Sequence, residues 1–274
     1  MSRQERYNMD RKLSKSKNLI LAVLGIIFLF LGWILASIVL GETRVPSPYR
    51  ILNRYIETFA SCPEIQFQGA GSNGFWPHVL ATLGRYLVGT LSGTAIAFVS
   101  LFLIARFKSF KEIFNPLIDI LRAIPPLALA PFFLLWFGTS QGGIIGIIVF
   151  YAFTMIFVAG AEALERLDPV QENFAKTLGA GKTTVVYHVL IPGLLPAMSG
   201  PIKVAYSWSW GLVIVGELLG AKSGVGRILN AFIAILSTDL VVVGIIWILI
   251  LAVFTERFVA FVLGKLLEWN VGKE

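Results

Sequence analysis

The sequence predicts an all-α integral membrane protein with six transmembrane helices. Of its 274 residues, 56% are hydrophobic and only 14% are charged, and the mean hydropathy is +0.78. A soluble domain carries about 25% charged residues. Several uncharged runs reach the roughly 20 apolar residues that a helix needs to cross a bilayer. The basic residues gather in alternate connections between these runs, as they do in proteins that span the membrane several times.

The first predicted span is 19–40, which follows a polar tail at 1–18. The uncharged run around it, from Asn18 to Gly41, is too long for the apolar region of a signal peptide. The second span is expected to begin near Val79. The uncharged run 123–161 is too long for one crossing, and the turn-rich residues 138–143 divide it. The remaining spans are expected at 116–137, 143–163, 201–220 and 240–263, with an interfacial or re-entrant segment at 226–237.

These spans divide the chain into a few regions. Residues 41–78 are polar and contain several prolines and glycines, so they are expected to form an irregular extracytoplasmic loop with one short helix. Residues 79–269 form the membrane core with five spans and a long cytoplasmic loop at 164–200, and 270–274 form a cytoplasmic C-terminus. No internal repeat is visible, so the chain does not resemble a secondary transporter built from two similar halves. A second copy of the chain could supply the missing half.

The distribution of basic residues sets the orientation. Of the 23 Lys and Arg residues, 16 lie in the tail, the connections and the C-terminal end on one side of the six-span arrangement, and five lie on the other side. Basic loops stay in the cytoplasm, so both termini are expected there. The net charge of +7 is therefore a topology signal. Because no basic patch is interleaved with aromatic residues, nucleic acid is not expected as a partner.

Catalytic and metal-binding patterns are missing from the sequence. The single cysteine, Cys62, excludes a disulfide within the chain, and the two histidines, His78 and His188, are far apart. Gly181-Lys182-Thr183 looks like the end of a phosphate-binding loop, but that motif needs a glycine where this chain has Lys176. We expect no cofactor in this chain and no enzymatic activity of its own.

The cytoplasmic stretch 168–192 carries the most specific pattern. Asp168 can cap a helix whose first residue is Pro169, and Gly179 suits the left-handed residue that ends a helix. A second short helix is expected at 184–190. Two short helices joined by a glycine elbow would project from the membrane and could dock in a groove of another protein. The prolines expected to end the second helix are Pro192 and Pro196.

This stretch resembles the EAA loop of permeases in binding-protein-dependent ABC importers. The loop has the pattern E-A-A, three residues, Gly, nine residues, then I-x-L-P. The matching residues are Asn173-Phe174-Ala175, Gly179 and Val189-Leu190-Ile191-Pro192. Asn173 replaces the glutamate, although Glu172 is adjacent, and Phe174 replaces an alanine. These departures affect any ionic contact assigned to the glutamate but keep the helix–glycine–helix shape.

Further motifs resemble the sulfonate/taurine/nitrate/bicarbonate-type branch of these permeases, and together they cover roughly 79–269. They are Leu121-Arg-Ala-Ile-Pro-Pro-Leu-Ala128, Leu135-Trp-Phe-Gly138, Thr177-Leu-Gly-Ala180, Gly216-Glu217, Gly224-Val-Gly226 and Leu266-Leu-Glu-Trp269.

The resemblance implies the type I ABC importer permease fold and a homodimer in a bacterial or archaeal plasma (inner) membrane. It also implies two cytoplasmic ABC ATPase subunits, which bind ATP and Mg, and an extracytoplasmic solute-binding protein. The solute in this branch is small and often anionic, although some members carry neutral or heteroaromatic compounds. The residues that the resemblance assigns to ATPase coupling are Glu172, Asn173, Ala175, Gly179, Ala180, Ile191 and Pro192.

Several residues within the predicted spans are candidates for the pathway or a gate. Ionisable side chains inside a membrane usually face a cavity or a partner. Asp119 and Arg122 are three residues apart and could pair with each other, whereas Glu217 could pair with an arginine of another helix. Prolines at 125, 126 and 131 should break the hydrogen-bond ladder of the third span, and freed backbone groups must face protein or water. The candidates are Arg85, Arg122, Pro125, Pro126, Tyr206, Trp210 and Glu217, with aromatic packing as an equal alternative for Tyr206 and Trp210.

Two functional alternatives remain open at this point. The chain could be a self-contained secondary transporter or channel, or a membrane enzyme. The missing catalytic cluster disfavours an enzyme, and an ATPase and a secreted binding protein encoded in neighbouring reading frames would favour the importer.

Overall fold

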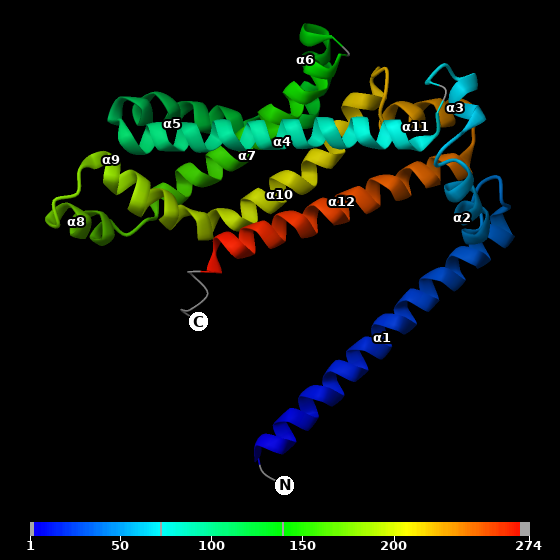
Figure 1. Cartoon of the computed structure of the whole chain (residues 1–274), viewed down its shortest axis with the longest axis horizontal. Coiled ribbons are helices and arrows are strands. Elements are labelled where there is room, and N and C mark those ends of the chain that lie inside the picture. The colour runs from blue at the N-terminus through cyan, green and yellow to red at the C-terminus, as the bar shows by residue number, and fades with distance from the viewer. Residues whose placement is uncertain (1–2, 72, 139, 269–274) are drawn as a thin grey trace.

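The protein is built from helices joined by short turns. The computed structural model describes residues 3–71, 73–138 and 140–268, without the side chains of 3–16, 19, 115, 118, 119 and 122. Figure 1 shows their arrangement. The elements are α1 (Arg3–Leu40), α2 (Pro48–Glu57), α3 (Pro63–Phe67), α4 (Phe75–Arg106), α5 (Lys108–Ala123), the 3₁₀ turn η1 (Pro126–Leu129), α6 (Ala130–Phe137), α7 (Gln141–Glu165), α8 (Pro169–Thr177), α9 (Lys182–Val185), the π turn η2 (Val186–Leu190), α10 (Ile191–Leu218), α11 (Val225–Ala234) and α12 (Thr238–Leu266).

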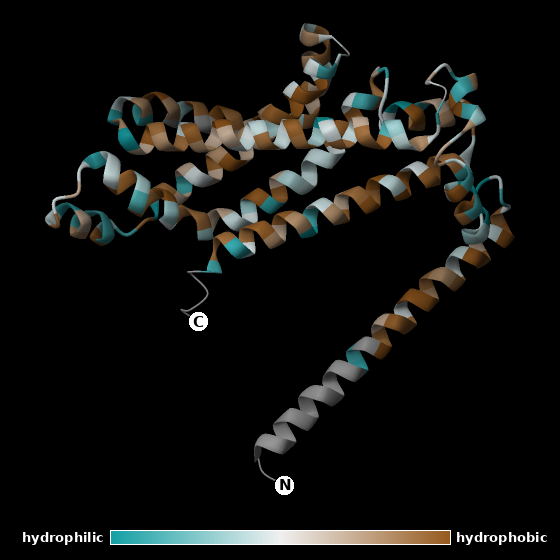
Figure 2. Ribbon diagram, in the orientation of Figure 1, coloured by the Kyte–Doolittle hydropathy of each residue, from teal (hydrophilic) through white to brown (hydrophobic). Residues whose placement is uncertain are grey.

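Five helical stretches among the described residues are long and apolar enough to cross a membrane. They match the first, second, fourth, fifth and sixth predicted spans, and Figure 2 shows hydrophobic residues predominating along α12 and along the described part of α1. Where an interfacial or re-entrant segment was predicted, at 226–237, the structure has the short apolar helix α11. The stretches are Ile20–Leu40, Phe75–Arg106, Gln141–Glu165, Lys182–Leu218 and Thr238–Leu266.

The third predicted span, 116–137, is not one helix. α5 ends at Ala123, Ile124 and Pro125 are extended, and the chain resumes as η1 and α6. Each of the two extended residues precedes a proline, whose ring disfavours the helical region for the residue before it. The break expected at Pro125 is therefore confirmed. The ladder is also interrupted before Pro131, which lies in the first turn of α6, directly after the 3₁₀ turn η1, where no amide donor is needed.

The first helix, α1, separates from the rest of the molecule. It is continuous from Arg3 to Leu40, so no helix end divides the predicted tail from the predicted span. Figure 1 shows it diverging from the other long helices, which lie roughly side by side. Its attachment lies near its C-terminal end, where the indole Nε1 of Trp33 donates to the carbonyl oxygen of Pro46 at 3.0 Å and Ser37 is buried.

The core forms where α4, α7 and α10 pack together. A Cβ atom on Gly93 of α4 would lie only 2.7 Å from the carbonyl oxygen of Val149 and 2.8 Å from the Cβ of Ala152 in α7. Glycine at this position lets the two backbones touch, as small residues do between membrane helices. α10 joins them through a stack of Trp210 on Tyr86, with ring centroids 4.2 Å apart.

The segment 41–78 is more ordered than the sequence indicated. It holds two helices, α2 and α3, where one was expected, and α4 begins at Phe75, four residues before the predicted Val79. α2 is held against the start of α12 because Arg50 and Arg54 both donate to Oδ2 of Asp239, with donor–acceptor distances from 3.0 to 3.3 Å.

The entry into α10 differs from the prediction. Pro192 and Pro196 were expected to end a short helix, but the helical stretch continues from Lys182 to Leu218. The π turn η2 accounts for this, since the amide of Ile191 donates to the carbonyl of Val186, five residues back. A π turn shifts the hydrogen-bond register of a helix. A proline placed directly after it therefore lies where the regular pattern has already changed, and such local adjustments accommodate missing amide donors in membrane helices.

Candidate functional site

α8 begins as the sequence predicts. Asp168 is the N-cap, its carboxylate accepts from the amide of Val170 at 2.9 Å, and Pro169 occupies the first turn. The side chain of a capping aspartate satisfies an amide that has no partner within the helix. Glu172 follows in the first turn, where a negative charge is favoured by the helix dipole, and it pairs with Lys176 one turn later.

The C-terminal end of α8 is a complete Schellman motif. Gly179 has a φ of +83°, its amide donates to the carbonyl of Lys176 at 3.0 Å, and the amide of Ala180 donates to the carbonyl of Ala175 at 3.1 Å. Glycine adopts this left-handed conformation without the steric cost that a Cβ atom brings. The glycine elbow predicted from sequence is therefore confirmed.

An apolar stripe runs along the exposed side of α8. Val170, Phe174 and Leu178 are spaced four residues apart, so they share one helix face, and they are 65%, 65% and 73% exposed. No residue of α8 is buried. We call these three residues the apolar stripe of α8. Phe174, which departs from the EAA pattern, is the largest residue of this stripe.

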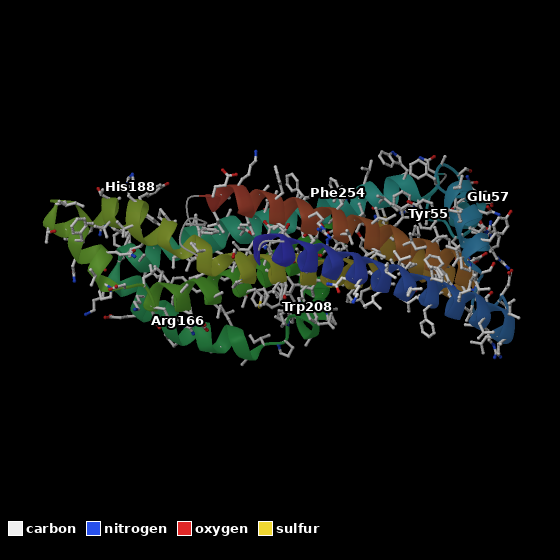
Figure 3. All side chains as sticks on the ribbon, turned by 90° about the horizontal axis from the view of Figure 1, so that it is seen from below. Tyr55, Glu57, Arg166, His188, Trp208 and Phe254 are labelled. Atoms are coloured by element: carbon white, nitrogen blue, oxygen red, sulfur yellow. The ribbon has the colours of Figure 1, made fainter. Side chains whose placement is uncertain are left out.

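The segment that follows α8 is anchored to the helix bundle. Val185 and Val186 are buried, and Arg106 at the end of α4 donates through Nε to Oγ1 of Thr183 at 3.1 Å. α8 therefore projects from a fixed base at the end of the bundle where α4 meets α5. Figure 3 labels Arg166 and His188 at this end, whereas Tyr55 and Glu57 lie at the opposite end with α2.

The residues assigned to coupling lie in three settings. Asn173 and Gly179 are exposed, Glu172 is half-buried in its pair with Lys176, and the remaining residues are half-buried against the chain itself. The last group is Ala175, Ala180, Ile191 and Pro192.

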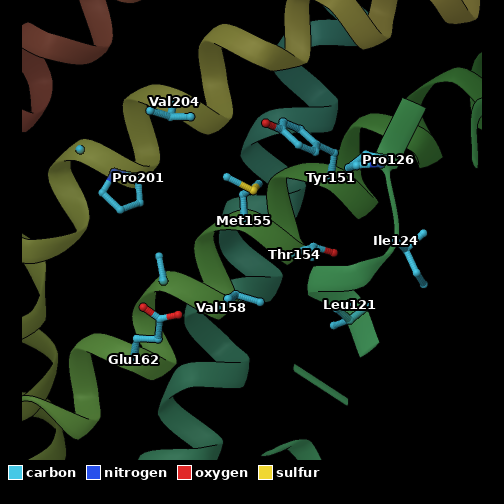
Figure 4. Close-up of a pocket in the computed structure, with 12 residues that line it drawn as sticks. Leu121, Ile124, Pro126, Tyr151, Thr154, Met155, Val158, Glu162, Pro201 and Val204 are labelled. Atoms are coloured by element: carbon cyan, nitrogen blue, oxygen red, sulfur yellow. The ribbon is translucent and has the colours of Figure 1, made fainter. Parts of the chain in front are cut away.

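A cavity of about 570 Å³ lies between α5, α7 and α10. Figure 4 shows Tyr151, Thr154 and Met155 of α7 between side chains of α5 and η1 on one side and α10 on the other. Its lining is mostly apolar, and Oγ1 of Thr154 is buried there without a hydrogen-bond partner among the described residues. The lining residues include Leu121, Ile124, Pro126, Pro201 and Val204.

The proline break shapes this cavity. Ile124 and Pro126 both line it, whereas the side chain of Pro125 is not among the lining residues. The extended Ile124–Pro125 step turns the chain between α5 and η1, and the cavity is bounded at this step. The expected pair of Asp119 and Arg122 falls on side chains outside the described residues.

The aromatic candidates in α10 point away from the cavity. Tyr206 hydrogen-bonds Thr94, and Trp210 donates through Nε1 to Oγ1 of Thr255 at 3.0 Å while stacking on Tyr86. Tyr206 is thus packed against α4, and Trp210 is packed against α4 and α12. The candidate stretch 206–210 also contains Trp208, which is exposed and lies one turn after Val204, a residue that lines the cavity.

Arg85 and Glu217 form a buried ion pair near the other end of the bundle. Their side chains are 3% and 0% exposed. The carboxylate of Glu217 also accepts from Oγ1 of Thr82 at 2.9 Å and from the amide of Gly226 at 2.9 Å. The guanidinium of Arg85 donates in addition to the carbonyl of Ser223 at 2.7 Å. The pairing of Glu217 with an arginine of another helix, raised as an option from sequence, is present.

This ion pair belongs to a network that holds the start of α11. Three consecutive amides there each find a buried side-chain acceptor: Gly224 donates to Nδ1 of His78, Val225 to Oγ1 of Thr82, and Gly226 to Glu217. A helix N-terminus carries unsatisfied donors and partial positive charge, so a buried carboxylate is well placed at it. Arg85 and Glu217 face this network and not the cavity.

Comparison with known proteins assigns the chain to a family. Residues 89–271 match the model of the family described as "Binding-protein-dependent transport system inner membrane component". The taurine transport system permease protein TauC of Escherichia coli is 24% identical over 264 residues, which cover 94% of this chain and 92% of that protein. The nitrate import permease protein NrtB of Synechococcus elongatus is 25% identical over 71% of this chain and 69% of its own length.

Relatives and solved structures extend the match. The putative aliphatic sulfonates transport permease protein SsuC of Bacillus subtilis is 26% identical over 85% of this chain and 80% of its own length. The inward-facing MetNI methionine ABC transporter superposes with a TM-score of 0.53 at 21% identity, over 67% of this chain and 93% of that chain, which shows a shared fold. The chain therefore belongs to the binding-protein-dependent transport system inner membrane components, has the type I ABC importer permease fold, and is a permease subunit of an ABC importer.

Proposed function

We propose that this permease works as a homodimer that forms the solute pathway and is driven by two ABC ATPase subunits through the segment 168–192. ATP and Mg would bind to those ATPases, and the chain itself would carry out no reaction. A solute-binding protein on the opposite side would deliver the solute. The family assignment leaves no support for the alternative of a self-contained secondary transporter or channel.

The apolar stripe of α8 is the observation that carries this proposal. Val170, Phe174 and Leu178 are exposed at the free end of a bundle, on a helix with no buried residue. An amphipathic helix that lays its apolar face into a groove is a recurring mode of protein recognition. The ion pair of Glu172 with Lys176 and the Asp168 cap keep α8 helical before docking, which lowers the entropy lost on binding.

The pathway is proposed to lie beside the cavity between α5, α7 and α10. The described lining is mostly apolar, and the hydroxyl of Thr154 has no partner among the described residues, which suits a passage that a solute crosses without tight binding. Movement of α8 would reach this cavity through α10, because α9, η2 and α10 form one continuous helical stretch whose residues Pro201 and Val204 line the cavity.

The orientation is proposed from the charges at the two ends. The α8 end carries exposed basic residues, including Lys108 and Lys182, which favour the cytoplasm. At the α2 end, two of the five basic residues, Arg50 and Arg54, are already paired with Asp239. Both termini would then be cytoplasmic. The relatives named for taurine, sulfonates and nitrate support a small solute of that kind, with specificity set by the binding protein.

Replacing Phe174 with Glu tests the proposal. The side chain is exposed in this chain, so membrane insertion and abundance should be unchanged, but a charge would enter the apolar groove of the ATPase. We expect loss of co-purification with a co-expressed partner ABC ATPase, and loss of solute uptake. Phe67→Glu is the matched control, because Phe67 is also exposed but lies in α3 at the other end. Normal ATPase binding and uptake by Phe174→Glu would exclude α8 as the docking element.

A further inference from the structure

The short helix α2 has three distinct faces. Ile51 and Thr58 are buried against the protein. Arg50 and Glu57 lie on a polar side, and Arg50 reaches Asp239 at the start of α12. The third face is apolar and belongs to neither group: Tyr49, Leu52 and Ile56 are spaced three and four residues apart and are 74%, 57% and 66% exposed. We call these three residues the apolar stripe of α2.

The start of α2 lies at the depth of the membrane-spanning part of α1. The carbonyl of Pro46, two residues before α2, accepts from the indole Nε1 of Trp33 at 3.0 Å. Trp33 lies seven residues before Leu40, the end of α1. At about 1.5 Å per residue this contact is about 10 Å back along α1, within its apolar run. The chain therefore leaves α1, turns, and returns toward the bilayer before α2 begins.

The far end of α2 is also set at the level of a membrane helix. Tyr55 stacks on Trp247 with ring centroids 4.8 Å apart, and Phe59, just after α2, stacks on the same indole at 5.6 Å. Trp247 lies nine residues after Thr238, the first residue of α12. Tryptophan and tyrosine collect where the hydrocarbon meets the headgroups, because their rings are apolar with one polar group.

We propose that α2 is an interfacial helix whose apolar stripe lies against membrane lipid. The helix would rest in the bilayer surface beside α1, with Ile51 toward the protein and Glu57 toward water. Three faces with these characters match a helix held at the junction of protein, lipid and water. Lipid is a better occupant than a second copy of the chain, because three side chains offer far less than the roughly 800 Å² per partner of a standard protein interface.

This arrangement would give the loop 41–78 a mechanical role. α2 is joined to α1 by a connection that Trp33 pins, and to α12 by the pairs of Arg50 and Arg54 with Asp239. A helix seated in the lipid surface would hold the outer ends of α1 and α12 at a fixed depth. The inference goes beyond the transport function and does not depend on which solute is carried.

Site-directed spin labelling tests the depth of α2. Single cysteines at Leu52, Ile56 and Glu57 would be introduced into the full chain carrying Cys62→Ala, labelled with a nitroxide and reconstituted in phospholipid vesicles. Glu57 is the control, since it neighbours Ile56 in sequence but lies on the polar side. Labels at Leu52 and Ile56 should collide several-fold more often with oxygen than with a water-soluble nickel chelate, and the label at Glu57 should show the reverse.

Two results would overturn the proposal. Equal nickel access at all three positions would place the whole helix in water. Labels at Leu52 and Ile56 that are immobilised and reached by neither reagent would place a protein, such as a second copy, over the stripe.

Discussion

Neutralising Glu217 should destabilise the protein, because it breaks the most deeply buried ion pair among the described residues. Glu217→Gln keeps the shape of the side chain but leaves Arg85 buried without its counter-ion. The pair is 3% and 0% exposed, and removing one partner of such a pair costs about 3–5 kcal/mol. Because Arg85 keeps its bonds to Oε1 of Gln141 at 2.6 Å and to the carbonyl of Ser223 at 2.7 Å, we expect the lower end, about 3 kcal/mol.

The measurement is the free energy of unfolding of the purified full chain in mixed micelles, followed by tryptophan fluorescence as SDS is added. A loss of about 3 kcal/mol lowers the folding equilibrium constant by roughly two orders of magnitude. Glu57→Gln is the control, because this carboxylate is exposed and lies 4.0 Å from Arg54, so its loss should cost less than about 0.5 kcal/mol.

A double variant separates the ion pair from the rest of the network. Arg85→Met with Glu217→Leu removes both charges, and such replacements are often close to neutral. Here the amide of Gly226 would still lose its acceptor, so we expect recovery of only part of the loss, with about 1–3 kcal/mol remaining. If the free energy of unfolding of Glu217→Gln lies within about 0.5 kcal/mol of that of the parent, the ion pair adds no stability beyond that of the other hydrogen bonds in the network.

Four further predictions address the elbow, the proline break, the loop and the orientation. Gly179 has a φ of +83°, so Gly179→Val should cost about 1 kcal/mol or more in conformational free energy and abolish ATPase association, while the membrane abundance stays normal. Gly179→Asn should keep both abundance and association, because asparagine tolerates this backbone conformation. If the two variants co-purify with the ATPase equally well, the elbow is not needed for docking. Pro125→Ala should lower uptake measured per permease molecule, because the residue before it is released from its extended state, and normal uptake would show that the break is not needed. Burial raises the pKa of Cys62 from 9.0 to about 11, so its thiolate is scarce at neutral pH and appears as the pH rises. Its labelling by maleimide at pH 7 should be about 100-fold slower than that of an ordinary thiol and should increase with pH, and fast labelling of the folded protein would refute this. In the Cys62→Ala background, a cysteine at Lys182 should be protected from an impermeant reagent in intact cells while one at Lys222 is labelled; the opposite pattern would invert the proposed orientation.

The elements that depend on local chemistry were predictable from sequence. Uncharged runs located five of the six predicted spans correctly, because a bilayer demands about 20 apolar residues whatever the neighbouring helices are. Asp168 and Gly179 predicted the ends of α8 because capping and left-handed termini depend on one or two residues.

Other features depended on contacts that the sequence does not display. Arg85 and Glu217 are 132 residues apart, so their pairing could be raised only as an option. Tyr206 and Trp210 were chosen as pathway candidates ahead of Trp208. The side of α10 that faces the core depends on its contacts with Tyr86 and the rest of α4, which the sequence of α10 alone does not display. The effect of Pro192 was misjudged because the π turn that precedes it shifts the hydrogen-bond register, and local propensity gives no sign of such a shift.

The π turn η2 also lets the coupling segment tolerate a change of chain length at one place. A π turn holds one more residue than the α-helical turn it replaces. Deleting a single residue within 186–190 would therefore convert η2 into an ordinary α-helical turn, while the segments on either side keep nearly the same direction. A deletion in the regular part of α10 would instead rotate everything before it by about 100° around the helix axis and move it about 1.5 Å along that axis. Phe174 would keep its direction after the first deletion and lose it after the second, so deletions within η2 should disturb ATPase association less than deletions in the regular helix that follows.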